Sequence, residues 1–446
     1  MVIFTGVTTV SRPSSTANLT RQETSLERPV LSSSLSLRKR ASRLLIVKFG
    51  GSSLNTSTKI RRAVKSVVRE YSRGERIVVV VSAIGKTTDQ LLALTNGGTG
   101  IVDTDKDDIL AMGERTSARL FAASLKSEGI QVRYFDPSDR DWPIITDDTF
   151  QQANPIKKRS IDRIQRYVKP VVDQGMIPVI GGFIGRTRDG RVSTLGRGGS
   201  DTTALLLALG LEADEVILVT SANGILSANP SLVRNVRTIR KIDMKALIGI
   251  ADAGTKFIHR RALRFKHEKI GIRVISNTIG DLTTEGTVIT GGPLPELDVK
   301  IHNPHPVTSV TLVGSNLSRN PDFIRKVIGL TKSSLEAASQ DDHSVIFYLK
   351  QTGRLKHQLA ALHRVVIEEP DGIALAVRTD MALITVKGVG LEGTPGVIAR
   401  ITETLRSNNI NIFGLLTITS SVLLLVEWRD RKKAARLMRI SLLENS

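Results

Sequence analysis

Two glycine-rich stretches carry the residues best suited to chemistry: V-K-F-G-G-S-S at Val47–Ser53 and T-L-G-R-G-G-S-D at Thr194–Asp201. A glycine loop that leads from a strand into a helix exposes backbone N–H groups to a phosphate, and Lys48 adds a mobile positive charge. In the second stretch, Arg197 can bind a carboxylate through two nitrogens. Asp201 opens an alanine- and leucine-rich helix whose dipole stabilises its charge. Together the loops favour phosphoryl transfer from a nucleotide to a small acidic substrate.

Neither stretch is a nucleotide-binding fingerprint by itself. The Walker spacing G-x-x-x-x-G-K-[ST] is absent at Lys48, and no G-x-G-x-x-G follows a strand. Taken alone, K-F-G-G-S-S also fits a tight turn between a strand and a helix. The meaning of each loop therefore depends on the rest of the chain.

The composition indicates packed domains without thiol chemistry. A chain of 446 residues with 40% hydrophobic residues should form about two to four domains. Because there is no cysteine, there is no disulfide framework and no thiolate nucleophile or metal ligand, and no metal site is assigned. No window reaches the roughly 18 apolar residues of a membrane span, so no membrane partner is expected.

The formal net charge is +20. Dense positive charge can bind nucleic acid, but here the basic residues are spread along the chain. An aromatic content of 4% also argues against stacking platforms for single strands. We therefore expect a solvated basic surface that attracts anionic substrates, and no nucleic-acid partner.

Residues 1–42 differ from the rest. They are rich in serine, threonine and basic residues and show no sustained apolar period, so they cannot bury enough surface to fold. We expect a disordered extension or a wrongly assigned start codon. A transit peptide is the alternative, against which Glu23 and Glu27 count. The expected location is the cytoplasm, or an organelle if this segment is a transit peptide.

Strands and helices alternate over residues 43–292. The candidate strands are mostly continuous apolar runs, which suit a parallel sheet covered on both faces. They are Leu44–Val47, Ile77–Ser82, Ile177–Ile180, Val216–Thr220 and Val274–Asn277. The candidate helices are Lys59–Tyr71, Asp108–Glu128, Ser160–Gln174, Asp201–Leu211, Met244–Ala253 and Ala262–Lys269. This order predicts an α/β sandwich with a mainly parallel central sheet, which would be the catalytic domain.

After a glycine- and proline-rich linker at 291–295, the pattern changes to an internal repeat of two small α+β modules, 303–370 and 376–446. The first would contain strands Ser309–Gly314 and Ser344–Leu349 with helices Pro321–Leu330 and Leu355–His363. The second would contain strands Met381–Val386 and Val422–Glu427 with helices Gly396–Asn408 and Arg431–Leu443.

The ordered motifs of the catalytic domain resemble the amino-acid kinase family and, within it, the aspartate kinases (aspartokinases). Besides the two loops, the resemblance rests on V-S-A-I-G-K-T-T-D at 81–89, G-E-R at 113–115, G-G-F-I-G at 181–185 and A-G-T-K-F-I-H at 253–259. The tail is similar to the paired, ferredoxin-like ACT modules that sense amino acids, through G-T-P-G-V at 393–397 and N-I-N-I at 409–412.

The resemblance implies a phosphotransferase with a carboxyl acceptor. It would transfer the γ-phosphoryl group of ATP to the β-carboxylate of L-aspartate and give 4-phospho-L-aspartate, the first step of lysine, threonine and methionine biosynthesis. ATP would be a co-substrate that carries its own Mg²⁺, with no tightly bound cofactor. Lysine or threonine would be the effector, and the ACT-like modules would form a homo-oligomer.

The resemblance also implies site residues. The catalytic residues would be Lys48 and Asp201. The substrate would be bound by Ser82, Thr88, Glu114, Arg197 and Ser200. The nucleotide would be bound by Lys48, Gly50, Gly51, Ser52, Thr220, Ser221 and Lys256.

Several of these residues also fit structural roles. Taken alone, Glu114 could be an acidic residue on a helix surface, and Lys256 could be a basic residue without a role in binding. Asp201 could simply cap the helix that it opens. His259 and His267 fit structural roles better than catalytic ones. A carboxylate acceptor is already ionised at neutral pH, so the reaction needs no general base.

The chain departs from the family after the strand Val216–Thr220. Ser221 stands where relatives have aspartate, Leu226 where they have tyrosine, and Ser231 where they have arginine. Two alternatives therefore stay open beside an aspartate kinase: a catalytically impaired amino-acid sensor, and a kinase for another small carboxylate.

Overall fold

The computed structural model describes residues 42–446, apart from 97–99, 253–257, 279, 293–297, 389–390, 392–395, 419–420 and 444–446. The expectations for the N-terminal extension up to residue 41, for Lys256 and for the turn at Gly393–Pro395 lie outside the described residues. In the described part of the chain, no helix is long and apolar enough to cross a membrane.

The N-terminal half is built on an eight-stranded sheet with the order β3-β4-β2-β1-β7-β9-β10-β8. All pairs from β3 to β9 are parallel, while β10 runs antiparallel to β9 and parallel to β8. The strands are β1 Leu44–Phe49, β2 Arg76–Val81, β3 Val132–Phe135, β4 Ile177–Gly181, β7 Glu215–Thr220, β8 Lys241–Asp243, β9 Gly271–Ser276 and β10 Thr287–Thr290. The predicted mainly parallel sheet is therefore confirmed.

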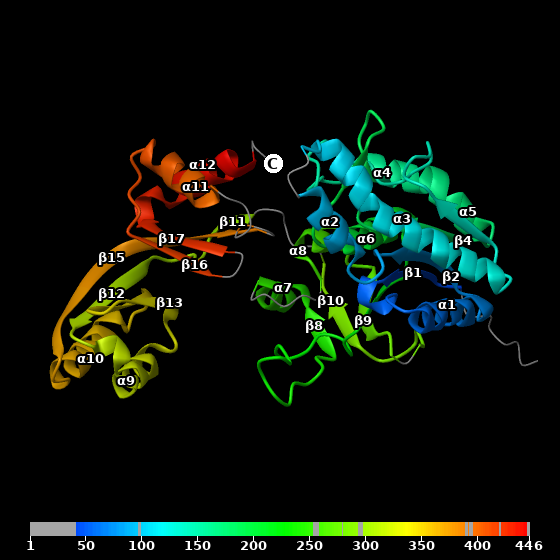
Figure 1. The fold of residues 1–446 in the computed structure, drawn as a ribbon. Helices are drawn as coiled ribbons and strands as arrows, with labels where there is room; N and C mark the ends of the chain where they lie inside the picture. The colour runs from blue at the N-terminus through cyan, green and yellow to red at the C-terminus, as the bar shows by residue number, and fades with distance from the viewer. Residues whose placement is uncertain are drawn as a thin grey trace, which may run out of the picture. The chain divides into compact units, whose positions relative to one another are not determined.

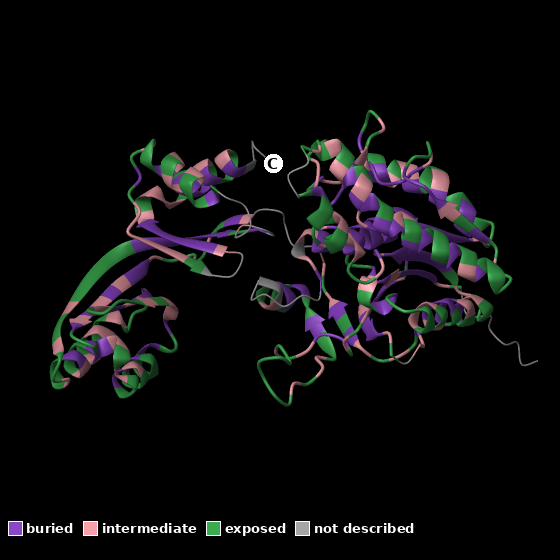
Figure 2. Cartoon of the chain, viewed as in Figure 1, coloured by how far each residue is buried: buried purple, intermediate pink, exposed green. Residues whose placement is uncertain are grey.

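Helices cover both faces of this sheet (Figure 1). One face packs against α1 (Ser57–Ser72) and α3 (Asp103–Ser127). The other packs mainly against α6 (Gly199–Leu211) and the π turn Ile164–Val168, which joins α4 (Lys157–Arg163) to α5 (Lys169–Asp173). Figure 2 shows the resulting burial, with buried strands between helices that are exposed on their outer sides. The remaining elements are the 3-10 turn η1 Gly51–Ser53, α2 Thr87–Thr95, α7 Met244–Asp252, α8 Arg260–Leu263 and the hairpin β5 Ile184–Arg186 and β6 Val192–Thr194.

The apolar strands divide their side chains between two cores. In β1, Leu44 and Ile46 belong to the core on the α6 side, while Leu45 and Val47 belong to the core on the α1 side. Because successive side chains of a strand point to opposite faces, Lys48 follows Ile46 onto the α6 side. The alternation thus aims a charged residue at the beginning of α6.

Three predicted helices differ from those observed. The predicted helix Asp108–Glu128 begins earlier, at Asp103. The predicted helix Ser160–Gln174 is interrupted by the π turn. The predicted helix Ala262–Lys269 is wrong, because α8 ends at Leu263 and the chain turns. There the buried Lys266 ammonium donates to the carbonyls of His267 (3.0 Å) and Ile270 (2.9 Å), which satisfies the turn internally.

The C-terminal half contains one seven-stranded antiparallel sheet. Its path runs β13-β14-β12-β15-β17-β16, and β11 also pairs with β15. The strands are β11 Asp298–Ile301, β12 Val307–Gly314, β13 Leu335–Gln340, β14 Ser344–Lys350, β15 Gly372–Lys387, β16 Gly414–Ile418 and β17 Ser421–Glu427. The helices are α9 Pro321–Thr331, α10 Leu355–Glu368, α11 Val397–Arg406 and α12 Arg431–Leu443.

The long strand β15 belongs to both halves of this sheet. Its first part pairs with β12, and its second part pairs with β17 and β11. Residues 372–375, which the sequence places between the two modules, are therefore strand. In addition, β11 precedes the first module in sequence but pairs with the β15 residues of the second.

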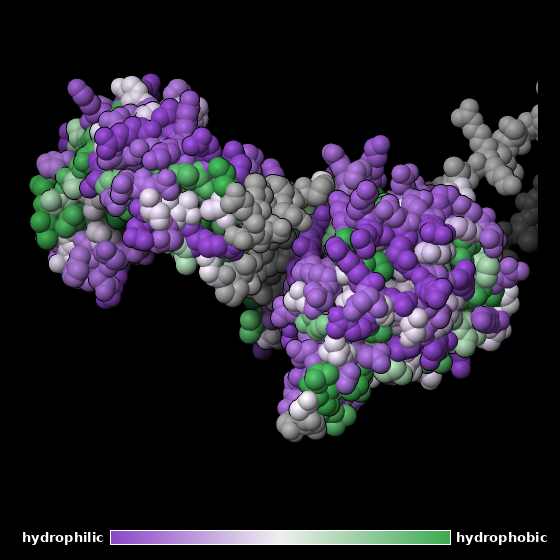
Figure 3. Space-filling model, turned by 90° about the horizontal axis from the view of Figure 1, so that it is seen from above, coloured by the Kyte–Doolittle hydropathy of each residue, from purple (hydrophilic) through white to green (hydrophobic). Residues whose placement is uncertain are grey.

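Each half of the sheet has its own helix-covered core. Phe323 and Leu362 lie in the core under α9 and α10, and Ile401 and Met438 lie in the core under α11 and α12. A third cluster joins the halves, because Tyr348 of β14 packs with residues of β15 and β17 such as Leu383 and Leu425. The surface seen in Figure 3 is mostly hydrophilic, in line with the net charge of +20.

Candidate active site

The first turn of α6 meets the ends of three parallel strands. Lys48 near the end of β1 forms an ion pair with Asp201, with its Nζ 2.7 Å from Asp201 Oδ1. Both side chains are largely buried, with exposed fractions of 13% and 10%. Asp201 is thus more than a helix cap, because its carboxylate compensates the charge of the one lysine that β1 directs toward α6.

The residues that follow strands β2 and β4 also contact the first turn of α6. Val78 and Val80 lie in the α6-side core, and Ser82 follows with the same alternation, so that its Oγ donates to Ser200 Oγ at 2.9 Å. After β4, Gly182 lies against Ser200, where a Cβ built on the glycine would be 2.6 Å from the Ser200 Cβ. Only glycine leaves room for α6 to approach the sheet this closely.

Glu114 lies on α3 and is only 3% exposed. Its Oε1 accepts the Ala83 N–H at 3.0 Å, and its Oε2 has no hydrogen-bond partner among the described residues. Burial raises the pKa of Glu114 to about 8, although the Ala83 N–H and the Lys48 charge oppose the rise. The alternative of a helix-surface acid is therefore wrong.

The first glycine loop packs closely on the loop that follows β2. A Cβ on Gly51 would lie 2.5 Å from the Ala83 carbonyl oxygen and 3.1 Å from that of Gly85. The loop leads into η1 rather than directly into a long helix, since α1 begins only at Ser57. Our expectation of a loop that feeds a helix N-terminus is corrected to this extent.

The second glycine loop presents Arg197 between two glycines in the left-handed region, Gly196 (φ 68°) and Gly198 (φ 77°). A Cβ on Gly196 would lie 2.9 Å from the Gln151 carbonyl oxygen, and one on Gly198 would lie 2.0 Å from the His259 Cβ. Arg197 itself is exposed, and no ion pair joins it to a described residue. Its guanidinium is available for an anion.

These loops surround a cleft of about 1010 Å³. Eight of the site residues expected from the sequence line it: Lys48, Gly51, Ser82, Thr88, Glu114, Arg197, Ser200 and Asp201. Four others, Gly50, Ser52, Thr220 and Ser221, are not among its lining residues. The structure thus brings the catalytic and substrate residues together and leaves most nucleotide residues outside this cleft.

The remaining nucleotide residues gather at the adjacent strand ends. The Gly50 N–H donates to the Val219 carbonyl at 3.2 Å, which places the end of β1 beside the end of β7. Thr220 ends β7, and its hydroxyl donates to the Ala222 carbonyl at 3.1 Å. Ser221 is exposed. This edge carries the carboxyl ends of the parallel strands, where α/β sheets bind their ligands.

The altered segment after β7 keeps its turns. Gly224 has φ 95°, and the Asn229 side chain accepts both the N–H and the hydroxyl of Ser231. The chain therefore still turns at Gly224 and Asn229, although Ser221, Leu226 and Ser231 differ from the family pattern.

The cleft is rich in positive charge. Besides Lys48 and Arg197, it is lined by Lys86, Arg261 and Arg264. In the described ranges, no group of three histidine, cysteine, aspartate or glutamate side chains could hold a metal ion. The positive charge suits a substrate that carries several negative charges.

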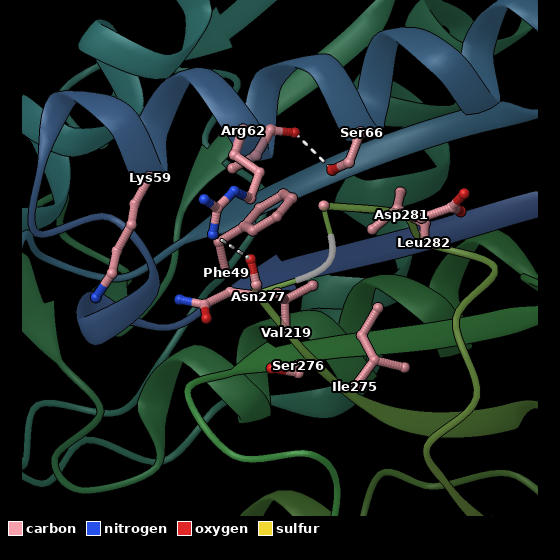
Figure 4. Close-up of a pocket in the computed structure, with 12 residues that line it drawn as sticks. Phe49, Lys59, Arg62, Ser66, Val219, Ile275, Ser276, Asn277, Asp281 and Leu282 are labelled. Carbon is pink, nitrogen blue, oxygen red and sulfur yellow. Dashed lines mark hydrogen bonds between the residues drawn. The ribbon is translucent and has the colours of Figure 1, made fainter. Parts of the chain in front are cut away.

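A second cavity lies between α1 and the ends of β7 and β9 (Figure 4). Arg62 points toward Asn277 there and donates to its carbonyl at 3.4 Å. With about 10 Å³ of space, this cavity has room for one water molecule and no substrate. The large cleft is therefore the candidate active site.

Comparison with known protein families identifies the family of the domain that contains this cleft. The amino acid kinase family matches residues 43–276, which include both glycine loops, α3 and β7. The chain belongs to the amino acid kinase family. The ACT domain family matches residues 376–439 of the same chain.

This amino acid kinase is similar over most of its length to proteins named aspartokinase. It is 28% identical to that of Geobacillus stearothermophilus over 390 residues, covering 83% of this chain and 89% of the relative. It is 29% identical to that of Rickettsia conorii, covering 87% of this chain and 96% of the relative. Aspartate kinase from Synechocystis shares the fold, with a TM-score of 0.71 at 22% identity, over 89% of this chain and 68% of that one.

Sequence reasoning missed several residues of this amino acid kinase that shape the cleft. Asp107, Gln151 and Arg261 hold its loops through contacts between segments far apart in sequence. The left-handed Gln151 carries no signal in its residue type. For Asp107 the signal was obscured, because it lies within the acidic run D-T-D-K-D-D, which favours a solvated helix start.

Proposed function

We propose that this amino acid kinase is an aspartate kinase. An oxygen of the aspartate β-carboxylate would attack the γ-phosphorus of ATP, the bond from that phosphorus to the bridging oxygen would break, and ADP would leave with the electron pair. The product is the acyl phosphate 4-phospho-L-aspartate. The supporting observation is the buried Lys48–Asp201 pair at 2.7 Å in a cationic cleft, in a chain whose relatives are named aspartokinase.

In this proposal Lys48 stabilises the charge that spreads over the transferring phosphoryl group. Asp201 holds the Lys48 ammonium in place until the phosphoryl group arrives. No residue has to remove a proton, because the acceptor carboxylate is already ionised. Catalysis then depends on position and charge.

The aspartate would lie between Arg197 and Glu114. Arg197 would bind a carboxylate through two nitrogens. Glu114 would take the substrate ammonium with Oε2, the buried oxygen that lacks a partner among the described residues. Ser82, Thr88 and Ser200 line the same cleft and would donate or accept further hydrogen bonds.

ATP would approach along the edge formed by the ends of β1 and β7. Gly50, Gly51 and Ser52 would meet its phosphates, and Thr220 and Ser221 its outer part. Lys256 completes the proposed nucleotide set. Mg²⁺ would be carried by the phosphate oxygens of ATP.

The C-terminal half would regulate the kinase. An ACT domain match at 376–439 supports an amino-acid effector, lysine or threonine, and a homo-oligomer assembled through the ACT-like halves. The reaction would supply lysine, threonine and methionine biosynthesis.

A coupled assay of ADP release with a panel of amino acids tests the activity. L-aspartate should give turnover with ATP, and hydroxylamine should trap the acyl phosphate. Turnover only with another carboxylate would replace aspartate as the substrate. Binding of amino acids without any turnover would instead identify an impaired sensor.

A further inference from the structure

Asp107 on α3 is a completely buried carboxylate, 0% exposed, with no role in the chemistry proposed above. The Gln151 N–H lies 3.0 Å from each of its oxygens. The Thr194 N–H donates to Oδ2 at 2.6 Å and the Thr194 hydroxyl to Oδ1 at 2.9 Å. Burial raises the pKa of Asp107, and the hydrogen bonds from Gln151 and Thr194 oppose the rise. A carboxylate with this many donors ties two distant segments together.

The first segment is the loop that contains Gln151. Its φ of 63° lies in the left-handed region, which is unfavourable for a residue other than glycine. The hydrogen bonds to Asp107 offset this cost. The Gln151 carbonyl oxygen packs against Gly196, because a Cβ built on this glycine would lie 2.9 Å from that oxygen. Asp107 therefore determines what packs against the backbone directly before Arg197.

The second segment is the end of β6. Thr194 is bound by Asp107 and lies three residues before Arg197, and its carbonyl accepts the Ala153 N–H at 2.9 Å. On the other side of Arg197, α6 begins at Gly199 with a buried first turn. The short loop that carries Arg197 is thus fixed at both ends.

Arg261 supports the same loop from a second direction. Its guanidinium donates to the Gln152 carbonyl at 3.1 Å, to Asn154 Oδ1 at 2.8 Å and to the Leu195 carbonyl at 3.5 Å. Asp107 and Arg261 therefore hold the backbone at residues 151–152 and at residues 194–195, directly before the loop that carries Arg197. Little freedom remains for the loop to adapt to a ligand of another length.

We propose that Asp107 is a positioning residue that fixes Arg197 relative to the Lys48–Asp201 pair and thereby selects a four-carbon over a five-carbon amino dicarboxylate. This inference rests on the proposed function, in which Arg197 binds one carboxylate while the other attacks the phosphorus. In an acceptor with one more methylene, the two carboxylates are farther apart. One of them must then leave its position, either the carboxylate at Arg197 or the one that attacks the phosphorus. A loop held by Asp107 cannot move to accommodate it.

The test uses the full chain with Asp107→Asn, which keeps the size but turns an amide NH₂ toward N–H donors. The KM for aspartate should rise about tenfold, while the KM for ATP stays within about twofold. The ratio of kcat/KM for aspartate over glutamate should fall at least about fivefold, since one methylene is worth about 10–200-fold in a well-fitted site. Asp103→Asn is the matched control. Its side chain is 65% exposed and, among the described residues, contacts the Gln151 and Lys106 side chains but no backbone N–H group, so all three values should stay unchanged.

Thr194→Val is a milder variant that removes only the hydroxyl donor to Asp107, and Thr194→Ser restores it. Thr194→Val should shift selectivity in the same direction by a smaller factor, and it decides the matter if Asp107→Asn does not fold. Amide hydrogen exchange at residues 151 and 194 should accelerate in Asp107→Asn and not in Asp103→Asn.

Unchanged selectivity in a folded Asp107→Asn, or lost selectivity with both amides still protected, would overturn the inference. An equal rise of both KM values would also overturn it, because it would indicate general damage. If the unaltered chain phosphorylates neither aspartate nor glutamate, the proposed function is wrong, and the proposed selectivity for aspartate is wrong as well. The exchange data then still show whether Asp107 holds the loop.

Discussion

The Lys48 ammonium and the Asp201 carboxylate lie 2.7 Å apart inside the cleft, with one residue on β1 and the other in the first turn of α6. Both are mostly buried, so neither charge is fully compensated by water. Binding a nucleotide phosphate would replace one strong partner of Lys48 with another.

Replacing Lys48 with alanine should lower kcat at least about 100-fold, because the lysine charge matters most in the transition state. The measurement is the steady-state rate with saturating aspartate and ATP. Lys65→Ala, which removes an exposed lysine of α1, is the control and should leave the rate unchanged. A Lys48→Ala enzyme with nearly normal kcat would rule out this role.

Arg197→Ala should raise the KM for aspartate about tenfold or more, with a smaller effect on the KM for ATP. A lost charged hydrogen bond accounts for about 1.5–3 kcal/mol. Arg188→Ala removes an exposed arginine that does not line the cleft and serves as the comparison. If the KM for ATP rises more than that for aspartate, Arg197 faces the nucleotide instead.

Glu114 predicts a pH dependence of substrate affinity. Because burial raises its pKa to about 8, the free enzyme holds a proton on Glu114 at lower pH. An aspartate ammonium favours the ionised form, so the KM for aspartate should fall as pH rises from about 6 to 8. In Glu114→Gln the KM should be high and flat over this range. A pH profile that is the same in both enzymes would contradict the assignment.

The same group also predicts the sign of a stability change. The pKa of Glu114 is higher in the folded chain than its ordinary 4.5, so the folded state binds more protons between about pH 5 and 8. The free energy of unfolding should therefore fall as pH rises through this window. Glu114→Gln should lose this component, which denaturant titration at several pH values can measure.

Gly182→Ala should destabilise the chain by about 1–3 kcal/mol, because the new Cβ would lie 2.6 Å from the Ser200 Cβ. The displaced α6 should also lower activity. In Gly249→Ala nothing lies within 4 Å of the added Cβ, and this change within α7 should be neutral or slightly stabilising. Equal melting temperatures for both variants would show that α6 adapts freely.

Removing all residues after Gly292 should abolish inhibition by lysine or threonine. An effector that acts at a distance must bind two states with different affinity, typically with a coupling of about 1–3 kcal/mol. Inhibition curves for the full and shortened chains provide the measurement. Full inhibition of the shortened chain would locate the effector site in the kinase domain.

The sequence predicted the parts of the fold that depend on local pattern. The apolar runs of β1 and β2 are buried on both faces, which is why they were recognisable. The first half of β15 is mostly exposed, and it was missed because the polar run Arg378–Asp380 separates Ile373–Val377 from the apolar run Met381–Val386. The length of α8 depends on the buried Lys266, which sequence periodicity does not reveal.

The site residues also divide into those that the sequence could predict and those that it could not. Lys48, Asp201 and Arg197 lie in motifs and could be predicted from residue type and order. Asp107 could not, because its partners are 44 and 87 residues away and bind it mainly through their backbones. A carboxylate that organises main-chain N–H groups places few demands on the residue types of its partners.

The shared strand β15 has a practical consequence for dividing this chain. A fragment that begins at residue 376 would lack β11, whose residues Asp298–Ile301 pair with Ile384–Lys387. That fragment would present an open row of backbone donors and acceptors beside apolar side chains, and such edges aggregate. A soluble regulatory fragment should instead begin before Asp298, so that the segment ahead of the first module can close the edge of the second.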